Sequence, residues 1–397
     1  MDTRLTPPPL GLYIHLPWCV QKCPYCDFNS HALRGELPED DYIAALLRDA
    51  DGEAAAAAGR VIETIFIGGG TPSLFSEDAI ERLMQGLRAR LPIAPEAEIT
   101  LEANPGTLEA GRFEGFLAAG INRLSIGVQS FNDEKLRILG RIHGVNDAIA
   151  AVEQAQKAGF KRFNIDLMHG LPEQTPEEAL ADVEQALNLG ARHISHYQLT
   201  LEPGTPFFTR PPRLPDDEQL ADIEAACHAR LRQAGLERYE ISAWSLPGEA
   251  CQHNLNYWQF GDYLAIGAGA HGKISDSSGR IRRYSKMRMP RQFQQYAGSP
   301  EAIAETREVT IAERPLEVMM NVLRLAEGMP AAELLARSGL GRDDLQPALA
   351  HAQSQGWLQS DAERIAPTEL GQRFLNDLLG LFMPEVVNPQ TDSRNGA

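Results

Sequence analysis

The sequence predicts an α/β fold: a partial (β/α) barrel of the TIM type, followed by a small helical, winged-helix-like C-terminal domain. Through about residue 270, short apolar runs alternate with amphipathic helical stretches, which indicates βαβ units and a parallel sheet. The alternation repeats often enough for most of a barrel, although periodicity alone leaves a doubly wound open sheet as the alternative. The last part of the chain loses the alternation and becomes mainly helical.

Short apolar runs rich in β-branched or aromatic residues predict the strands. The clear ones are Leu12–Leu16, Thr64–Ile67, Ile99–Glu102, Arg123–Val128, Phe163–Leu167 and Ile194–Leu199, and the fainter ones are Tyr239–Ser242 and Tyr263–Ile266. Helical patterns lie between them, near residues 40–57, 77–90, 108–119, 146–158, 176–189 and 217–234.

Polar or glycine-rich loops follow five of these strands. In chain order they read PWCVQKCPYC, GGGTPS, ANPGT, QSFN and MHGLP. Because the carboxyl ends of the strands form the active-site face of (β/α) folds, we expect the five loops to converge on one mouth.

The C-terminal region predicts three helices, a small hairpin and a last helix, an order that resembles a winged-helix domain. The helices are Leu316–Leu325, Ala331–Ser338, Asp343–Gln355 and Glu369–Leu381, and the hairpin is GWLQS with RIAPT. From Ile311 onward there are 12 acidic and 7 basic residues and no lysine, which disfavours DNA binding and favours a packing or partner-recognition role. The expected organisation is a flexible N-terminus (1–10), barrel (11–275), linker (276–312), helical domain (313–383) and disordered tail (384–397).

Charge and composition exclude several classes of protein. The 397 residues include 54 acidic and 37 basic ones, a net charge of −17, which argues against non-specific binding to nucleic acid or to an anionic membrane. We find no signal peptide and no apolar run long enough for a transmembrane segment, and we expect a cytoplasmic protein. Five cysteines, three of them within eight residues, do not suggest a disulfide framework.

The closely spaced cysteines are the strongest chemical signal. Cys19, Cys23 and Cys26 lie on one short loop, and three thiolates can hold three irons of a [4Fe–4S] cluster, leaving the fourth iron open. A zinc site that adds His31, or buried unreactive cysteines, are the alternatives. Cys227 lies in a helical stretch, where buried packing is expected.

The cysteine spacing, with Tyr25 directly before the third cysteine, resembles the signature of radical S-adenosylmethionine (SAM) proteins. YIHLPWCVQKCPYCDF, followed by GGGTPS, GVQSFN, NIDLMHGLP and HNLNYW, resembles the HemN/HemW group over nearly the whole chain. The resemblance implies a radical SAM barrel, a [4Fe–4S] cluster, an electron donor, and SAM bound at the open iron and cleaved to a 5′-deoxyadenosyl radical.

The resemblance also implies which residues contact SAM. The glycine loop meets the methionyl amino group, Arg141 the carboxylate, Asp166 the ribose and Gln198 the adenine. The full set is Tyr13, Tyr25, Gly69, Gly70, Thr71, Glu102, Gln129, Arg141, Asp166 and Gln198. Ordinary structural roles stay open beside these: a strand-to-helix turn, ion pairs, an exposed helix arginine, and core packing for Tyr13.

A second motif, HNLNYW, contains a histidine among aromatic residues. Such a histidine is often a core residue, but histidine is also an axial haem ligand and aromatic rings can cover a porphyrin. In the chaperone branch of the group this motif is associated with haem. The haem candidates are therefore His253, Asn254, Tyr257, Trp258 and Cys251, and His271 also falls near the expected mouth.

Two features separate the branches of the group. Phe28 stands where the oxidase branch carries a further cysteine, and only 12 residues precede Tyr13, where the oxidase has a longer extension.

We expect a haem chaperone that delivers haem to respiratory membrane enzymes. The alternative is an oxygen-independent coproporphyrinogen III oxidase, and a winged-helix regulator that senses iron or redox state is disfavoured by charge. Whether the protein is an enzyme stays open, as does a homodimer, and no catalytic residue is assigned.

Overall fold

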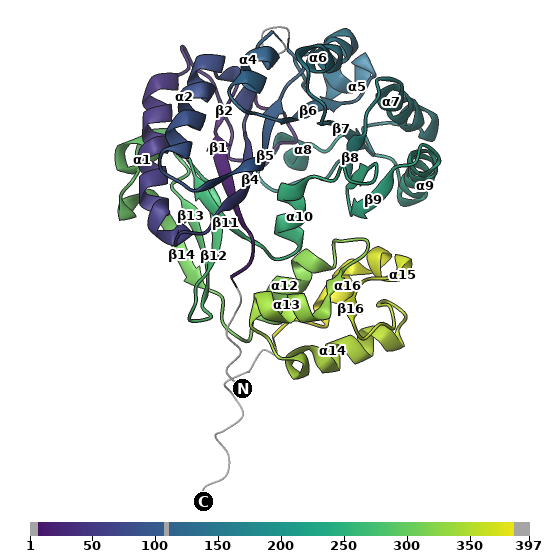
Figure 1. The fold of residues 1–397 in the computed structure, drawn as a ribbon. Coiled ribbons are helices and arrows are strands. Elements are labelled where there is room, and N and C mark those ends of the chain that lie inside the picture. The colour runs from purple at the N-terminus through teal and green to yellow at the C-terminus, as the bar shows by residue number, and fades with distance from the viewer. Residues whose placement is uncertain (1–6, 107–110, 385–397) are drawn as a thin grey trace, which may run out of the picture.

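A single large sheet dominates the computed structural model, which describes residues 7–106 and 111–384 (Figure 1). Twelve strands follow the order β14-β13-β12-β11-β1-β4-β5-β6-β7-β8-β10-β9. The strands from β11 to β8 pair in parallel, as predicted, and the flanking ones are antiparallel. The order has two ends, so this described sheet is open, as a partial barrel is.

The parallel strands overlap the predicted apolar runs, although β5 begins six residues before its predicted start. They are β1 (Leu10–Leu16), β4 (Ile62–Gly69), β5 (Ile93–Ala103), β6 (Arg123–Gln129), β7 (Phe163–His169), β8 (His193–Gln198) and β11 (Asp262–Ile266). In β1, Leu10, Leu12, Ile14 and Leu16 are fully buried. Because strand side chains alternate between faces, the residues between them point to the other face of the sheet.

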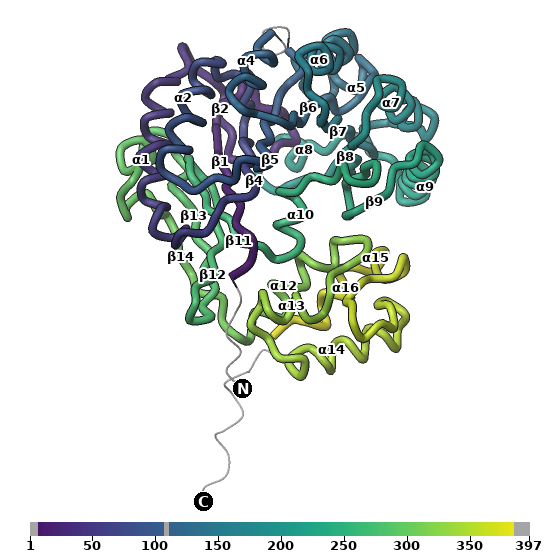
Figure 2. Tube along the Cα trace, viewed as in Figure 1, coloured from purple at the N-terminus to yellow at the C-terminus, as the bar shows by residue number. Residues whose placement is uncertain are grey.

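Helices cover the outer side of the sheet (Figure 2). The principal ones are α1 (Glu39–Ala57), α2 (Glu77–Arg88), α4 (Phe113–Ala118), α6 (Val145–Ala158), α7 (Pro176–Asn188) and α9 (Asp217–Gln233). Their starts have local causes: the Ser76 side chain caps α2, and Thr175 and Glu178 form a capping box on α7. The predicted helix at 108–119 is described only from residue 111 onward, because 107–110 lie outside the described residues.

The expected linker at 276–312 is wrong. Those residues contain β13 (Ile281–Lys286), α11 (Pro290–Tyr296) and β14 (Ile303–Glu308), which continue the sheet from β12 (His271–Ser275). A buried ion-pair cluster holds this extension: Lys286 Nζ lies 2.7 Å from Asp49 and 2.6 Å from Glu53, both on α1.

Other boundaries differ at the ends of the two domains. The faint strand at 239–242 is replaced by β9 (Glu237–Glu240) and β10 (Ala243–Ser245). Pro8 is buried and β1 begins at Leu10, so residues 7–10 are part of the fold. The predictions for residues 1–6 and for the tail 385–397 lie outside the described residues.

The C-terminal domain is mainly helical and has a core of its own. It contains α12 (Arg314–Val322), β15 (Met329–Pro330), α13 (Ala331–Ser338), α14 (Arg342–Ser354), β16 (Arg364–Ile365), α15 (Glu369–Arg373) and α16 (Leu375–Gly380). The single predicted last helix is divided at Phe374, whose backbone leaves the helical region. Phe260 and Ile281 from the first domain join this core. In the described part of the chain, no helix has both the length and the apolar character that crossing a bilayer requires.

Helix α10 (Gln252–Trp258) lies between the two domains (Figure 1). It contacts β1, β4 and β11 on one side and α12 on the other. The HNLNYW motif forms nearly all of this helix, so the motif stands where the sheet meets the C-terminal domain.

Candidate functional site

A cavity of about 490 Å³ lies at the carboxyl-terminal halves of the parallel strands, under the cysteine loop. Four of the five loops singled out in the sequence contribute to its lining, through residues such as Cys23, Gly70, Asn104 and Gln129. The fifth loop, MHGLP, does not. The predicted convergence of the strand ends is therefore observed for four loops.

The cysteine loop follows β1 and folds back on itself. The Cys26 amide donates to the Cys23 carbonyl at 3.2 Å, and the Cys26 thiol lies 3.6 Å from the Ser30 hydroxyl. Burial raises the pKa of the Cys19 thiol, and the Thr71 side chain opposes that rise. All three predicted cysteines line the cavity.

The spacing of these thiols bears on what they can hold. Among the described residues, no group of three His, Cys, Asp or Glu side chains is placed to bind one metal ion. A four-iron cluster binds each cysteine through a different iron, so its ligands need not surround one point, and three cysteines on one loop suit that arrangement.

The glycine loop is pressed against the cysteine loop, and this contact explains its composition. A Cβ atom on Gly70 would lie 2.5 Å from the Trp18 carbonyl oxygen. Gly69 has a φ of 120°, and its amide donates to Glu102 Oε2 at 3.0 Å. The Thr71 amide donates to the Trp18 carbonyl at 2.7 Å. Only glycine allows this close approach.

Two partly buried carboxylates form an acidic wall of the cavity. Burial, aided by the nearby Asp166, raises the pKa of Glu102 to about 7. Burial also raises the pKa of Asp166, which accepts hydrogen bonds from Ser125 Oγ at 3.1 Å and Asn164 Nδ2 at 2.7 Å. Such a wall favours a ligand with cationic groups and hydroxyl donors.

A partly buried arginine lies beside the cysteine loop. Arg141 donates to Asn104 Oδ1 at 2.6 Å and to the Gly127 carbonyl at 2.8 Å, and its Nη1 lies 3.7 Å from Cys23 Sγ. Its buried Nε has no hydrogen-bond partner among the described residues. The acidic wall, this guanidinium and the glycine loop together fit the ammonium, sulfonium, carboxylate and ribose groups of SAM.

Gln129 occupies a strained position at the end of β6. Its φ is 72°, which is uncommon for a residue other than glycine, and its Oε1 accepts from the Tyr197 hydroxyl at 2.5 Å. Of the ten predicted SAM residues, eight line the cavity: Tyr25, Gly69, Gly70, Thr71, Glu102, Gln129, Arg141 and Asp166.

The structure places two of the predicted residues elsewhere. Gln198 is exposed, and its neighbour Tyr197 lines the cavity instead, because adjacent strand residues face opposite ways. Tyr13 packs against Phe66, with its hydroxyl 3.0 Å from His15 Nδ1, and does not line the cavity.

The HNLNYW helix divides between core and cavity. His253 is fully buried, and its Nδ1 lies 2.9 Å from Thr64 Oγ1. Its ring stacks on Phe66 and meets the Tyr257 ring edge-on. Neither His253, Tyr257 nor the buried Cys251 lines the cavity, whereas Asn254 and Trp258 do. In this conformation the His253 ring is a core group and is not accessible as a haem ligand.

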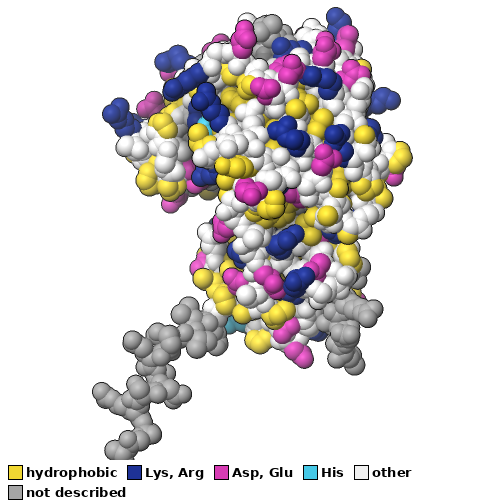
Figure 3. Space-filling model, turned by 90° about the vertical axis from the view of Figure 1, so that its left-hand side faces the viewer, with side chains coloured by type: hydrophobic (Ala, Val, Ile, Leu, Met, Phe, Trp, Pro, Cys, Tyr) yellow, Lys and Arg dark blue, Asp and Glu magenta, His cyan; other side chains and the backbone are white. Residues whose placement is uncertain are grey.

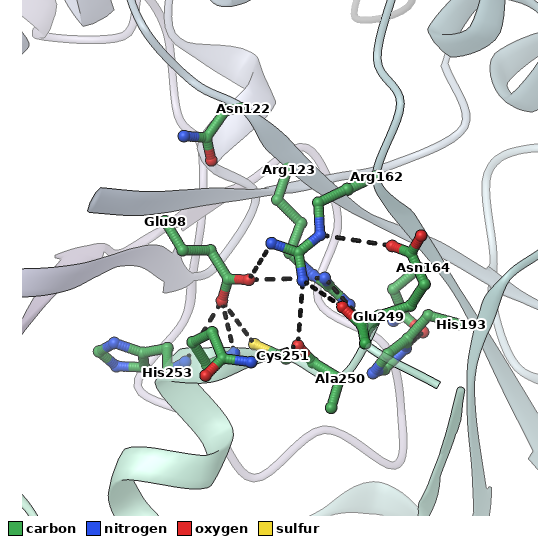
Figure 4. A network of polar contacts seen from close by, with 12 residues as sticks. Glu98, Asn122, Arg123, Arg162, Asn164, His193, Glu249, Ala250, Cys251 and His253 are labelled. Atoms are coloured by element: carbon green, nitrogen blue, oxygen red, sulfur yellow. Dashed lines mark hydrogen bonds and ion pairs between the residues drawn. The ribbon is translucent and has the colours of Figure 1, made fainter. Parts of the chain in front are cut away.

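A buried polar network holds the start of that helix (Figure 4). Glu98 Oε1 accepts from the backbone amides of Gln252 at 2.7 Å and His253 at 3.3 Å. Glu98 Oε2 lies 3.2 Å from Arg162 Nη1 and 3.6 Å from Arg123 Nη1. The network therefore fixes α10 to the middle of β5 and to the amino-terminal ends of β6 and β7.

Two remaining predictions concern residues away from the site. Cys227 is buried in α9, as expected. His271 is exposed at the start of β12 and does not line the cavity.

Asn104, Ser125, Ser195 and Arg324 line the cavity but were not singled out in the sequence. Asn104 lies in the ANPGT loop and was within reach of sequence reasoning, whereas nothing in the sequence distinguishes Arg324.

Known proteins match both parts of the chain. A model of the radical SAM superfamily matches residues 13–186, and a model of the HemN C-terminal domain matches residues 309–374. A protein named heme chaperone HemW in Escherichia coli K12 is 55% identical, over 95% of this chain and 99% of that protein. A protein of the same name in Bacillus subtilis is 33% identical over 94% and 99%. The chain belongs to the HemW family.

A solved relative supports the same fold. The structure of coproporphyrinogen III oxidase (HemN) from Escherichia coli, described as a radical SAM enzyme, has a TM-score of 0.79 and 25% sequence identity. The match covers 95% of this HemW family member and 90% of that chain. Membership of the radical SAM superfamily implies a [4Fe–4S] cluster and SAM, and the cavity described above has the residues to hold both.

Proposed function

We propose that this protein is a haem chaperone, which binds haem and delivers it to respiratory membrane enzymes while holding a [4Fe–4S] cluster and SAM. The observation that carries the proposal is the near full-length relation, at 55% identity, to a protein named heme chaperone HemW. An electron donor for the cluster, the haem-receiving enzymes, a cytoplasmic location and a homodimer belong to this proposal as its partners and setting.

Phe28 favours this function over coproporphyrinogen III oxidation. Its side chain is 63% exposed and lines the cavity two residues after Cys26, where the oxidase branch carries a further cysteine. A phenyl ring cannot ligate iron or move a proton. The similarity to the oxidase structure is then one of fold, and the oxidase activity is the alternative that the experiment below also tests.

Different residues of the cavity would bind the cluster and SAM. Cys19, Cys23 and Cys26 would hold the cluster. The glycine loop and the acidic wall would orient SAM, and Arg141 would neutralise its carboxylate. When bound, this pair of cofactors supplies reductive cleavage of the SAM sulfonium bond in the superfamily. The protein's own part is to bind, orient and shield them from water.

The face of the molecule shown in Figure 3 offers no support for nucleic acid as a partner. On the face shown in Figure 3, acidic and basic side chains are interspersed over both domains, and no extended basic field is visible there. A protein that tracks a phosphate backbone needs such a field.

The test is an anaerobic haem titration of the cluster-reconstituted protein, followed by absorbance. We expect saturation near one haem per chain. A parallel reaction with coproporphyrinogen III, reductant and SAM, beside an active oxidase, should yield no decarboxylated product. Absence of saturable haem binding rejects the chaperone function, and decarboxylated product would establish the oxidase instead.

A further inference from the structure

One end of the cavity is lined by residues that the SAM assignment leaves unused. They come from β8, from the region of β9 and β10, from α10 and from the C-terminal domain: Ser195, Glu240, Ser242, Asn254, Trp258 and Arg324. This end holds an aromatic ring, an amide, two hydroxyls, a guanidinium and one carboxylate, that of Glu240. The ring and the guanidinium suit a second ligand with a planar body and an anionic group, provided that Glu240 leaves part of the guanidinium available.

Among the described residues that line this cavity, Arg324 is the one cation from the C-terminal domain. It lies two residues after the end of α12, and the chain beside it is tied to the sheet. The Ala326 amide donates to the Tyr239 carbonyl at 3.0 Å, and Leu325 forms a bridge with Glu240. The backbone of Arg324 is thus fixed against the first domain, with its side chain directed to the cavity.

The guanidinium of Arg324 has hydrogen-bonding capacity to spare. It lies over the Trp258 ring, 4.4 Å from the ring centroid, and its Nη2 is 3.4 Å from Glu240 Oε2. Its buried Nε has no hydrogen-bond partner among the described residues. Stacking on an aromatic face leaves the in-plane N–H donors of a guanidinium available, and Glu240 engages only one edge.

Glu240 does not depend on Arg324 for its position. Its other oxygen, Oε1, accepts from the Ser242 amide at 3.0 Å. A carboxylate of a ligand can therefore bind Arg324 beside Glu240 while Glu240 keeps its hydrogen bond to the Ser242 amide. Arg141 lies beside the cysteine loop, with contacts to Cys23, Asn104 and Gly127. It shares none of these contacts with Arg324.

We propose that Arg324 recognises a carboxylate of the second ligand in this cavity. Resting on the proposed function, that carboxylate is a propionate of haem, with Trp258 alongside the tetrapyrrole edge. The methionyl carboxylate of SAM is the other source of the same chemistry, and the experiment separates the two. The C-terminal domain then takes part in ligand recognition and is more than a packing partner of the sheet.

The test uses the full-length, cluster-reconstituted protein and its Arg324→Gln and Arg324→Lys variants. Haem and haem dimethyl ester, whose propionates are uncharged, are titrated separately, and SAM affinity is measured by equilibrium dialysis. Arg238→Gln is the matched control, because Arg238 donates to Gln372 across the same domain boundary but does not line the cavity.

We expect Arg324→Gln to weaken haem binding about tenfold or more, as loss of a charge-assisted hydrogen bond does. Arg324→Lys should recover part of the loss, and Arg238→Gln should stay within about twofold of the parent. The ester should bind the parent and Arg324→Gln equally, and SAM affinity should not change.

Three results would overturn the inference while leaving the chaperone function intact: unchanged haem affinity in Arg324→Gln, equal losses for haem and its ester, or a loss confined to SAM. A parent protein that binds no haem rejects the proposed function itself, and the inference with it.

Discussion

Replacing Glu98 tests whether the buried network fixes the helix that carries the HNLNYW motif. Glu98→Ala removes a buried carboxylate that accepts two backbone amides of α10 and pairs with Arg162 and the fully buried Arg123. Removing one partner of a buried ion pair leaves the other charge uncompensated, which costs about 3–5 kcal/mol. Glu98→Gln keeps an acceptor oxygen for the amides and loses only the charge, so we expect about 1–3 kcal/mol.

The assay is urea unfolding of the holoprotein, with Glu96→Ala as the control. Glu96 lies on the same strand, two residues earlier, and is exposed, so its replacement should change the free energy of unfolding by less than about 0.5 kcal/mol. A Glu98→Ala cost below about 1 kcal/mol would refute the reasoning, since the network would then not hold α10. Equal costs for Ala and Gln would show that the charge, and not the acceptor geometry, carries the effect.

Three further outcomes follow from the site. Cys23→Ala should abolish iron binding on reconstitution while Cys227→Ala leaves it unchanged, and iron per chain reports both. Gly70→Ala forces a Cβ to within 2.5 Å of the Trp18 carbonyl, so it should lose about 1–3 kcal/mol of stability and weaken SAM binding, whereas Gly380→Ala, with open space around it, should not. Burial raises the pKa of Glu102 to about 7, so its carboxylate is mostly ionised above that pH and mostly protonated below it. SAM affinity should therefore fall as the pH drops through about 7, and a Glu102→Gln variant that kept the same pH dependence would exclude Glu102 as its origin.

The sequence pattern predicts the parallel strands of the sheet and most of the residues that we expected to line the cavity, because both depend on local features. The parallel strands are short, apolar and followed by distinctive loops, and the ends of such strands must meet at one edge of the sheet. The cysteine and glycine loops follow β1 and β4 directly, so their juxtaposition comes from the pairing of adjacent strands.

The sequence-based predictions fail for residues whose position depends on which face of a strand they occupy or on contacts with residues far away in the chain. In β8, both faces carry polar or aromatic residues, so the pattern does not say whether Tyr197 or Gln198 faces the cavity. His253 is held in the core by Thr64 and Phe66, nearly two hundred residues earlier, and no local pattern reports that contact. Arg324 likewise becomes a cavity residue only through docking of the C-terminal domain.

The pairing of β1 has a consequence for how the protein is made. β1 lies between β4, which follows soon in the chain, and β11, whose residues 262–266 emerge about 250 residues later. Until β11 has been synthesised, β1 is an edge strand with unpaired backbone groups, and the cysteine loop directly follows this edge strand. Since chains are synthesised at about 5–20 residues per second, this interval lasts about ten seconds or more. A ribosome stalled before residue 262 would thus present the cysteines on an open sheet edge, prone to pairing with other chains.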